Sequence, residues 1–311
     1  MAEGDCGVTT TCPLSILSIA LYSARTIMID RLIYTYNWMR HPSQRDFLNM
    51  GEGIVSRAKR YSRFWQNHLA LTKEFTEHAF ESSNASGNLA VLGAGRLLDV
   101  DCERLADRFS TIDLYDNDPG ALTVWKKATR PFPRKFKFNL LDLTGALDYW
   151  KRWLQGPQQL VEKLSTLPPL PAIPLEVGQY STVLSLNLLG QIPLYWRDRV
   201  TESIANRSLN QAEQAALDES CRLLESQHIN LLQNCGAQSV VLLSDSEYYY
   251  YEPNTVNWQV EPAVFEMELD HNQYQETLRD CWLWHLAPYG AEGSKYGEIH
   301  RVEARAYIAN S

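Results

Sequence analysis

Residues Leu89–Leu98, with the sequence LAVLGAGRLL, decide the fold of this chain. The apolar run up to Leu92 predicts a buried strand, and the glycines that follow it predict a tight turn into a helix near residues 97–109. Glycines allow positive φ angles and the close approach of a ligand, and the first turn of a helix offers free backbone N–H groups. The stretch therefore predicts a nucleotide-type site, although Leu98 stands where the dinucleotide-binding fingerprint has its third glycine.

The pattern downstream of residue 88 is typical of a Rossmann-like α/β domain. Short apolar runs alternate with amphipathic stretches, as in strand–helix units around a parallel sheet. We expect a doubly wound, mostly parallel, seven-stranded sheet with an antiparallel terminal strand. The predicted strands lie near residues 89–93, 111–115, 136–140, 181–187, 239–244, 281–287 and 299–308. The predicted helices lie near 97–109, 119–128, 145–154, 194–206 and 211–235, and the proline-rich residues 167–174 predict a surface connection.

The N-terminal part of the chain has a different pattern. Apolar and aromatic residues recur at helical spacing between residues 13 and 80, with a break at His41-Pro42-Ser43. Residues 82–87, SSNASG, have the composition of a linker. We therefore expect two domains, a helical N-terminal cap at residues 1–87 and the α/β domain at residues 88–311.

Polar residues follow the predicted strands where each of them ends. Asp116 comes about 20 residues after the glycine turn, the spacing at which folds of this kind bind a ribose. A carboxylate accepts two hydroxyl hydrogen bonds, so Asp116 is the candidate for the ribose diol, with Asn117 or Asp118 beside the base. For Asp118 the favoured interpretation is instead a cap on the helix that opens at Pro119.

The third and fourth predicted strands end in polar groups as well. Asp142, which Leu143 follows, is suited to accept a hydrogen bond from an adenine amine, or else to cap the helix near Gly145. Asn187 emerges from an apolar strand at the carboxyl edge of the sheet, where open α/β sheets bind their ligands. The predicted cofactor-binding residues are Gly93, Ala94, Gly95, Asp116, Asn117, Asp142, Leu143 and Asn187.

The four motifs together resemble those of the class I S-adenosylmethionine-dependent methyltransferases, and the chain looks like a bacterial-type member with a helical N-terminal extension. The resemblance implies that Gly93 and Gly95 approach the methionine part of the cofactor, S-adenosylmethionine. It also implies that Asp116 binds the ribose, that Asp142 meets adenine, and that Asn187 lies near the methyl group and the acceptor. The two predicted terminal strands fit the antiparallel strand pair of that family.

The residues after the fourth and fifth predicted strands bear on the methyl acceptor. The chain has Asn187-Leu188-Leu189-Gly190 in place of the Asn-Pro-Pro-Tyr motif that holds planar amines, and it has no Pro-Cys dipeptide of a cytosine C5 enzyme. An unknown small molecule or a protein side chain is therefore expected as acceptor, and no catalytic base is assigned. The candidate acceptor-side residues are Gln191, Tyr195, Asp245 and Tyr248.

Two aromatic stretches leave alternatives open. The tyrosines at residues 248–251 predict either an aromatic cage for a cationic amine or, preferably, a hairpin or loop that packs against the helical cap. Trp282 and Trp284 share one face of a predicted strand, which is expected to face helices. His285 points the other way, as a structural histidine by preference or as a general base.

Composition and charge bear on the partners and the compartment. The chain has 311 residues and a formal net charge of -8, which disfavours a broad nucleic-acid-binding surface because phosphate contacts need clustered Lys and Arg. The six cysteines have no Cys-x-x-Cys spacing, so reduced thiols and no metal are expected. The N-terminus lacks the basic region of a signal peptide, and the apolar residues 14–22 are too short to span a bilayer. A cytoplasmic protein without membrane contact is therefore expected.

Three other functions stay open on the sequence alone. A catalytically inactive S-adenosylmethionine- or nucleoside-binding protein also fits, because no recognisable catalytic group follows the fourth strand. An aminopropyl transferase of the spermidine synthase type has a similar sheet but needs an Asp where Asn187 stands. A nicotinamide-dependent oxidoreductase is disfavoured by Leu98 and by the terminal strand pair. Leu97 departs from the methyltransferase pattern as well, because many members have a third glycine at that position.

Overall fold

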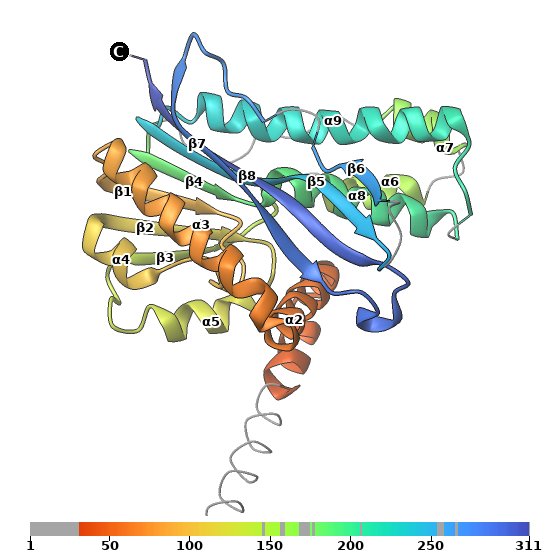
Figure 1. The fold of residues 1–311 in the computed structure, drawn as a ribbon, viewed down its shortest axis with the longest axis horizontal. Coiled ribbons are helices and arrows are strands. Elements are labelled where there is room, and N and C mark those ends of the chain that lie inside the picture. The colour runs from red at the N-terminus through yellow and green to blue at the C-terminus, as the bar shows by residue number, and fades with distance from the viewer. Residues whose placement is uncertain are drawn as a thin grey trace, which may run out of the picture.

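The computed structural model of this chain describes residues 31–144, 147–155, 159–167, 175, 178–205, 207–253, 258–264 and 267–310. Its centre is an eight-stranded sheet with the order β3-β2-β1-β4-β5-β8-β7, and β6 pairs with β5 beside this path (Figure 1). The strands are β1 (Gly87–Leu92), β2 (Phe109–Asp116), β3 (Phe136–Leu140), β4 (Thr182–Leu186), β5 (Ser239–Tyr251), β6 (Trp258–Pro262), β7 (Tyr274–Ala287) and β8 (Gly297–Ala309).

The strand directions confirm the predicted fold class. The strands β3, β2, β1, β4 and β5 run parallel to one another, and β8 runs antiparallel between β5 and β7. This is a Rossmann-like, mostly parallel sheet with an antiparallel terminal strand. The strand β6 is an addition to the expected seven, because β5 does not end near residue 244 but continues to Tyr251 and forms a hairpin with β6. The tyrosines at residues 248–251 therefore belong to a strand.

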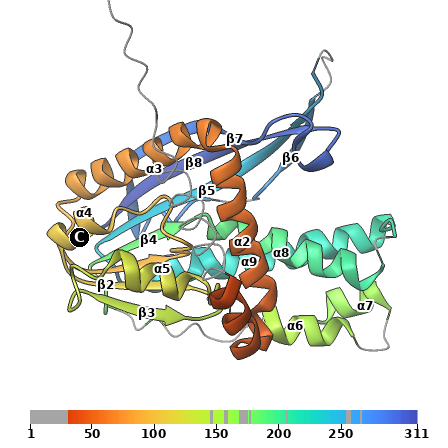
Figure 2. The ribbon, with the colours of Figure 1, turned by 90° about the horizontal axis from the view of Figure 1, so that it is seen from below.

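Helices cover both faces of the sheet, as a doubly wound fold requires (Figures 1 and 2). Leu89 and Val91 of β1 point into a core shared with the helices at residues 62–82, 102–108 and 121–128. Ala90 and Leu92 point into a second core shared with the helices at residues 188–203 and 211–234. This alternation buries β1 on both faces, as is usual for a central parallel strand. The helices are α2 (Arg45–Arg60), α3 (Ser62–Ser82), α4 (Cys102–Arg108), α5 (Ala121–Ala128), α6 (Leu147–Leu154), α7 (Leu160–Ser165), α8 (Leu188–Ser203) and α9 (Gln211–Asn234).

The N-terminal helices are attached to the sheet in two ways. The helix α3 lies along β7, and its Phe80 meets Phe109 of β2 edge-on, with ring centroids 5.1 Å apart. The helix α2 precedes α3 and is joined to it at Tyr61. It crosses the end of the sheet toward α6 and α8 (Figure 2). Before it come the helix at residues 31–40 and the 3-10 turn η1 (Pro42–Gln44), which confirms the predicted break at His41-Pro42-Ser43.

One helix start was predicted wrongly. The helix expected near residues 97–109 begins only at Cys102, because the φ angles of Gly93, Gly95 and Leu97 are 75°, 48° and 58°, outside the right-handed helical region. The carboxylate of Asp101 caps α4 by accepting hydrogen bonds from its first turn. The glycine turn therefore leads into a loop and does not present the free amides of a helix N-terminus.

Other element boundaries also differ from the prediction. The helix α8 begins at Leu188 and carries Pro193 in its interior, whereas the sequence suggested a start near residue 194. The helix α7 was not predicted, and a second 3-10 turn, η2 (Ala291–Gly293), joins β7 to β8. The expected connection at residues 168–174 and the apolar stretch at residues 14–22 lie outside the described residues. No helix within the described ranges is long and apolar enough to cross a membrane.

Candidate functional site

The glycine turn joins the carboxyl ends of three neighbouring strands. The backbone N–H groups of Gly93 and Ala94 both donate to the carbonyl of Tyr115 at 3.0 Å, which ties the turn to the end of β2. A Cβ atom on Gly93 would lie 2.5 Å from the carbonyl oxygen of Leu186 at the end of β4. Only glycine therefore suits position 93, for reasons of both space and its positive φ.

Asp116 fixes the geometry of this edge. One oxygen of its carboxylate accepts a hydrogen bond from Gly95 N at 2.7 Å, and the other accepts from Asp118 N at 2.8 Å. Burial raises the pKa of Asp116, and these backbone donors oppose the rise by stabilising the charged form. A strand-end carboxylate is thus held in one orientation by the turn beside it.

Arg96 and Asp118 form a buried ion pair next to the turn. The Arg96 Nε atom lies 2.5 Å from Asp118 Oδ2, and its Nη1 lies 3.0 Å from Glu52 Oε1 of α2. Asp118 Oδ1 also accepts from Gly120 N at 2.7 Å in the turn before α5. The predicted cap by Asp118 on a helix opening at Pro119 was wrong, because α5 begins at Ala121 and its N-cap residue is Gly120, without a side-chain capping bond. Burial raises the pKa of Asp118 to about 6 in spite of Arg96. The pair connects α2 to the sheet edge.

Two cavities lie between α2 and this edge. The smaller has a volume of about 80 Å³ and the larger about 450 Å³, and both are lined by Asp116, by Gln191 of α8, and by Phe47 and Met50 of α2. The smaller cavity is mainly apolar, and its remaining lining residues are Asn117, Leu141, Asp142, Leu143, Leu188, Ile192 and Tyr195. The helix α2 therefore forms one wall of both cavities, and Asp116 lies where they meet.

The start of α2 is held over the smaller cavity by polar contacts. Asp46 pairs with Lys151 of α6, lies 3.4 Å from Arg199 Nη1 of α8, and accepts from the Tyr195 hydroxyl at 3.3 Å. The ring of Phe47 stacks on Tyr195 at a centroid distance of 4.6 Å. Gln44 just before α2 donates to Asn117 Oδ1 at 2.6 Å. The helix is therefore anchored at its first turn as well as at Glu52.

The larger cavity is lined by a chain of polar groups on β5 and β8, of which Asp245 and His300 are buried and Glu298 is half-buried. The Nδ1 atom of His300 lies 2.9 Å from Asp245 Oδ2, and its Nε2 lies 2.9 Å from Glu298 Oε1. Burial opposes charge on this ring, but the two carboxylates outweigh it and raise the pKa of His300 to about 9. His300 is therefore an imidazolium at neutral pH, with both ring N–H groups donating to carboxylates.

An aromatic wall stands beside this polar chain. His68 of α3 stacks on Trp284 of β7 with ring centroids 4.1 Å apart, and Trp65 meets Trp284 edge-on at 4.7 Å. Trp282 donates to His68 Nδ1 at 3.0 Å, and burial lowers the pKa of His68 to about 4. His68 is thus neutral. The contacts with α3 confirm that Trp282 and Trp284 share a face turned toward a helix.

Most residues predicted from the sequence meet at these cavities. Gly93, Gly95, Asn187 and Asp245 line the larger one, whereas Asn117, Asp142, Leu143 and Tyr195 line the smaller one. Asp142 also closes its own turn, accepting from Thr144 N at 2.9 Å. Ala94 and Tyr248 line neither cavity, because Ala94 is fully buried and Tyr248 packs on the ring of His300 at 4.4 Å.

Several lining residues could not be predicted from the sequence pattern. His285, the histidine that the pattern singled out, stacks near Phe64 and lines neither cavity, whereas His300 and His68 line the larger one. His300 lies in the strand predicted near residues 299–308 and Glu298 lies just before it, so two polar residues at alternating positions were the only available signal. Other lining residues that were not predicted include Asp99 in the loop after the glycine turn, Asp198 of α8 and the residues of α2.

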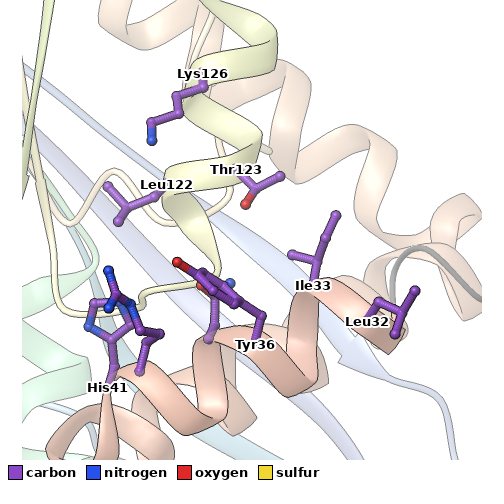
Figure 3. A pocket seen from close by; sticks show the side chains of 9 residues that line it. Leu32, Ile33, Tyr36, His41, Leu122, Thr123 and Lys126 are labelled. Atoms are coloured by element: carbon purple, nitrogen blue, oxygen red, sulfur yellow. The ribbon is translucent and has the colours of Figure 1, made fainter.

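A separate groove lies away from this site. It has a volume of about 560 Å³ and runs between the helix at residues 31–40 and α5 (Figure 3). Tyr36 and His41 project from the first helix toward Leu122 of α5 in this groove. No predicted site residue lines it.

Comparisons with known proteins add similarity of backbone only. No protein-family model matches this chain, and no curated protein matches it. One similar solved structure is a putative RNA methyltransferase from Pyrococcus horikoshii, with 11% identity, a TM-score of 0.39, and coverage of 78% of this chain and 84% of that one. A second is an S-adenosylmethionine-dependent methyltransferase from Clostridium acetobutylicum, with 8% identity, a TM-score of 0.37, and coverage of 79% and 97%.

A third similar structure is the 1,6-didemethyltoxoflavin-N1-methyltransferase of Burkholderia thailandensis, which contains 1,6-didemethyltoxoflavin and S-adenosylhomocysteine. Its identity is 9% and its TM-score 0.38, and the match covers 84% of this chain and 88% of that one. Sequence identities and TM-scores this low say nothing about whether the active sites are alike. A functional conclusion therefore depends on the residues of this chain.

Proposed function

We propose that this chain is an S-adenosylmethionine-dependent methyltransferase. The observation that carries the proposal is the position of Asp116, which lies beside the glycine turn at the junction of the two cavities. A carboxylate at the end of the second strand is suited to a ribose diol, and the ligand of such a sheet lies outside its carboxyl edge. With its ribose at Asp116, the cofactor would place its adenine in one cavity and its methionine part in the other.

The two cavities differ in the way that this cofactor requires. The smaller cavity is mainly apolar and is lined by Leu141, Leu143 and Ile192. Asp142 lines it as well, and its carboxylate would accept a hydrogen bond from an adenine amine. The larger begins at Gly93, and there the Asn187 side-chain oxygen is buried without a hydrogen-bond partner among the described residues. A buried polar atom without a partner costs about 1–3 kcal/mol, so a ligand donor at Asn187 would relieve that cost.

The protein's own contribution to methyl transfer would be positioning and exclusion of water. The cofactor supplies an activated methyl group on a sulfonium. Phe47 and Met50 of α2 cover both cavities, so we propose that the N-terminal helices act as the cap of the α/β domain at residues 88–311. The larger cavity has room for a small acceptor or for one side chain of a partner protein.

Calorimetric titration of the full chain with S-adenosylhomocysteine, S-adenosylmethionine and NAD tests this proposal. We expect both adenosyl compounds to bind and NAD not to bind. Asp116→Ala should weaken S-adenosylhomocysteine by roughly 10- to 100-fold, the scale for losing charged hydrogen bonds. Asp113→Asn is the matched control, because Asp113 is a buried aspartate of the same strand that instead accepts from the Tyr180 hydroxyl. Binding of NAD without binding of S-adenosylhomocysteine would refute the proposal.

Catalysis is tested separately from binding. Transfer of a labelled methyl group from S-adenosylmethionine to a fraction of a cell extract is expected in the presence of the wild-type chain. Transfer should fall in the Asp116→Ala variant and persist in Asp113→Asn. Intact binding without transfer in any extract would identify a binding protein and contradict the enzymatic part of the proposal.

A further inference from the structure

One buried carboxylate oxygen of the polar chain on β5 and β8 has no hydrogen-bond partner among the described residues. Asp245 is 3% exposed and lines the larger cavity, and its Oδ2 is engaged by His300. Its Oδ1 is buried and has no hydrogen-bond partner among the described residues. Because a buried carboxylate oxygen without a partner is costly, this atom is suited to a donor from a ligand.

His300 cannot receive a proton from that ligand. Both of its ring nitrogens face carboxylates at 2.9 Å, and it carries its own proton on each. It holds Asp245 in place by donating to Oδ2. Asp245 Oδ1 is therefore available to accept a hydrogen bond from a ligand in the larger cavity.

The charge around Asp245 favours a cation. The imidazolium of His300 offsets one of the two carboxylates that flank it, and Asp198 of α8 adds another negative charge to the wall. His68 is neutral at the pH of the cell. Two arginines also line the cavity, but Arg96 is bound to Asp118 and Glu52, and Arg57 has an interaction of its own.

The aromatic wall adds a preference for a flat, apolar group next to that cation. Trp284 is 5% exposed, lines the cavity, and has an indole Nε1 without a partner among the described residues. Trp65 and the neutral His68 continue this surface. Aromatic faces attract cations and stack on other rings.

We propose that the methyl acceptor is a primary or secondary amine on a planar or apolar group, and that Asp245 Oδ1 binds its nitrogen. The inference rests on the proposed function and names the substrate class of that same site. The amine enters as an ammonium ion, and the aromatic wall of Trp65, His68 and Trp284 contacts the group that carries it.

Methyl transfer to this amine needs no proton acceptor other than Asp245. The ammonium gives one proton to Asp245 Oδ1, which exposes the nitrogen lone pair. That pair forms the new N–C bond to the methyl carbon, and the C–S bond breaks with its electron pair remaining on sulfur. The product is a methylated ammonium ion and a neutral thioether, and Asp245 returns its proton to water.

Saturation-transfer NMR on the full chain loaded with S-adenosylhomocysteine tests the inference. The probes are benzylamine, benzyl alcohol and benzoate, which share a ring and differ in the charge of the attached group. We expect benzylamine to bind at least tenfold more tightly than benzyl alcohol, the scale of one charged hydrogen bond, and benzoate to bind most weakly. Asp245→Asn should remove this preference, and Asp113→Asn should keep it.

His300 provides a second test of the same arrangement. His300→Asn keeps a donor near the position of Nδ1 and should retain the benzylamine preference, whereas His300→Leu should lose it. Unchanged binding of S-adenosylhomocysteine in each variant shows that the fold and the cofactor site are intact, so a failure of the inference is distinguishable from a failure of the proposed function. Equal affinities of the wild type for benzylamine and benzyl alcohol would overturn the inference, and so would an undiminished preference in Asp245→Asn.

Discussion

Two glycines of α2 should respond in opposite ways to replacement by alanine. A Cβ on Gly51 would lie 2.0 Å from Asp118 Oδ2 and 3.2 Å from Arg96 Nε, whereas a Cβ on Gly53 would meet nothing within 4 Å. Neither glycine has a positive φ, so the difference is one of space alone. In an open helical position, Gly→Ala stabilises a protein by about 0.5–1 kcal/mol.

The expected cost at Gly51 follows from the ion pair that it covers. Asp118 cannot move aside easily, because Arg96 Nε at 2.5 Å and Gly120 N at 2.7 Å hold its two oxygens. The side chains of Arg96 and Asp118 are only 9% and 7% exposed, and breaking a buried pair costs about 3–5 kcal/mol. After the gain in helix propensity, Gly51→Ala should destabilise the fold by about 2–4 kcal/mol.

Urea unfolding followed by circular dichroism measures both effects. Gly53→Ala should raise the free energy of unfolding, and Gly51→Ala should lower it. In an Asp118→Ala background the contacts at 2.0 and 2.7 Å are absent and only the end of the Arg96 side chain, at 3.2 Å, has to shift, so Gly51→Ala should lose most of its cost there. Equal effects of the two glycine substitutions, or an unchanged cost of Gly51→Ala in the Asp118→Ala background, would refute this reasoning.

Three further predictions concern the turn and the buried histidines. Gly93→Ala should lower the thermal unfolding temperature more than Gly290→Ala does. Both positions have φ near 75°, but only a Cβ at position 93 would meet a carbonyl oxygen, at 2.5 Å. Equal decreases in the two variants would contradict this. His68 and His228 are buried with pKa values lowered to about 4, so their contribution to stability should be lost as pH falls from 6.5 toward 4, by about 2 kcal/mol each at pH 5. Urea titrations at pH 7 and pH 5 check this, and His228→Gln should show a weaker pH dependence. The pKa of His300 is raised to about 9, so the stability that its charge contributes is fully present below pH 6.5 and is lost as pH rises through 9. The free energy of unfolding of the wild type should therefore fall more steeply between pH 6.5 and 9 than that of His300→Gln, and equal slopes would argue against this assignment.

The sequence predicted the sheet, and with it the meeting of several candidate residues at one edge, for a topological reason. Parallel strands bring their carboxyl ends to the same edge, so Gly93, Asp116, Asp142 and Asn187 had to lie near one another once the strands were assigned. Short apolar runs that end in a polar residue mark such strands clearly. Residues 97–101 were mistaken for the start of a helix because the positive φ of Leu97 has no sequence signature.

The other side of the site depends on long-range pairing. His300 meets Asp245 and Trp284 only because β8 inserts between β5 and β7 with one particular register, in which His300 lies opposite Tyr248 and Trp284. A shift of one residue would turn His300 to the opposite face. The position of α2 over the cavities depends likewise on ion pairs with partners distant in the sequence, such as Glu52 with Arg96.

The lengths of the strands have a consequence for the behaviour of the site. The strands β5, β7 and β8 have 13, 14 and 13 residues, whereas β1 and β4 have six and five, so the long strands extend past the edge where the short ones end (Figure 1). Asp245, Trp284 and His300 lie on this extension, within a hydrogen-bonded ladder, whereas functional groups of many folds lie on loops. Such a wall is preorganised, so its amide protons should exchange slowly whether or not a ligand is bound. Changes of specificity in related chains would then come from single side-chain replacements on a rigid surface and not from remodelled loops.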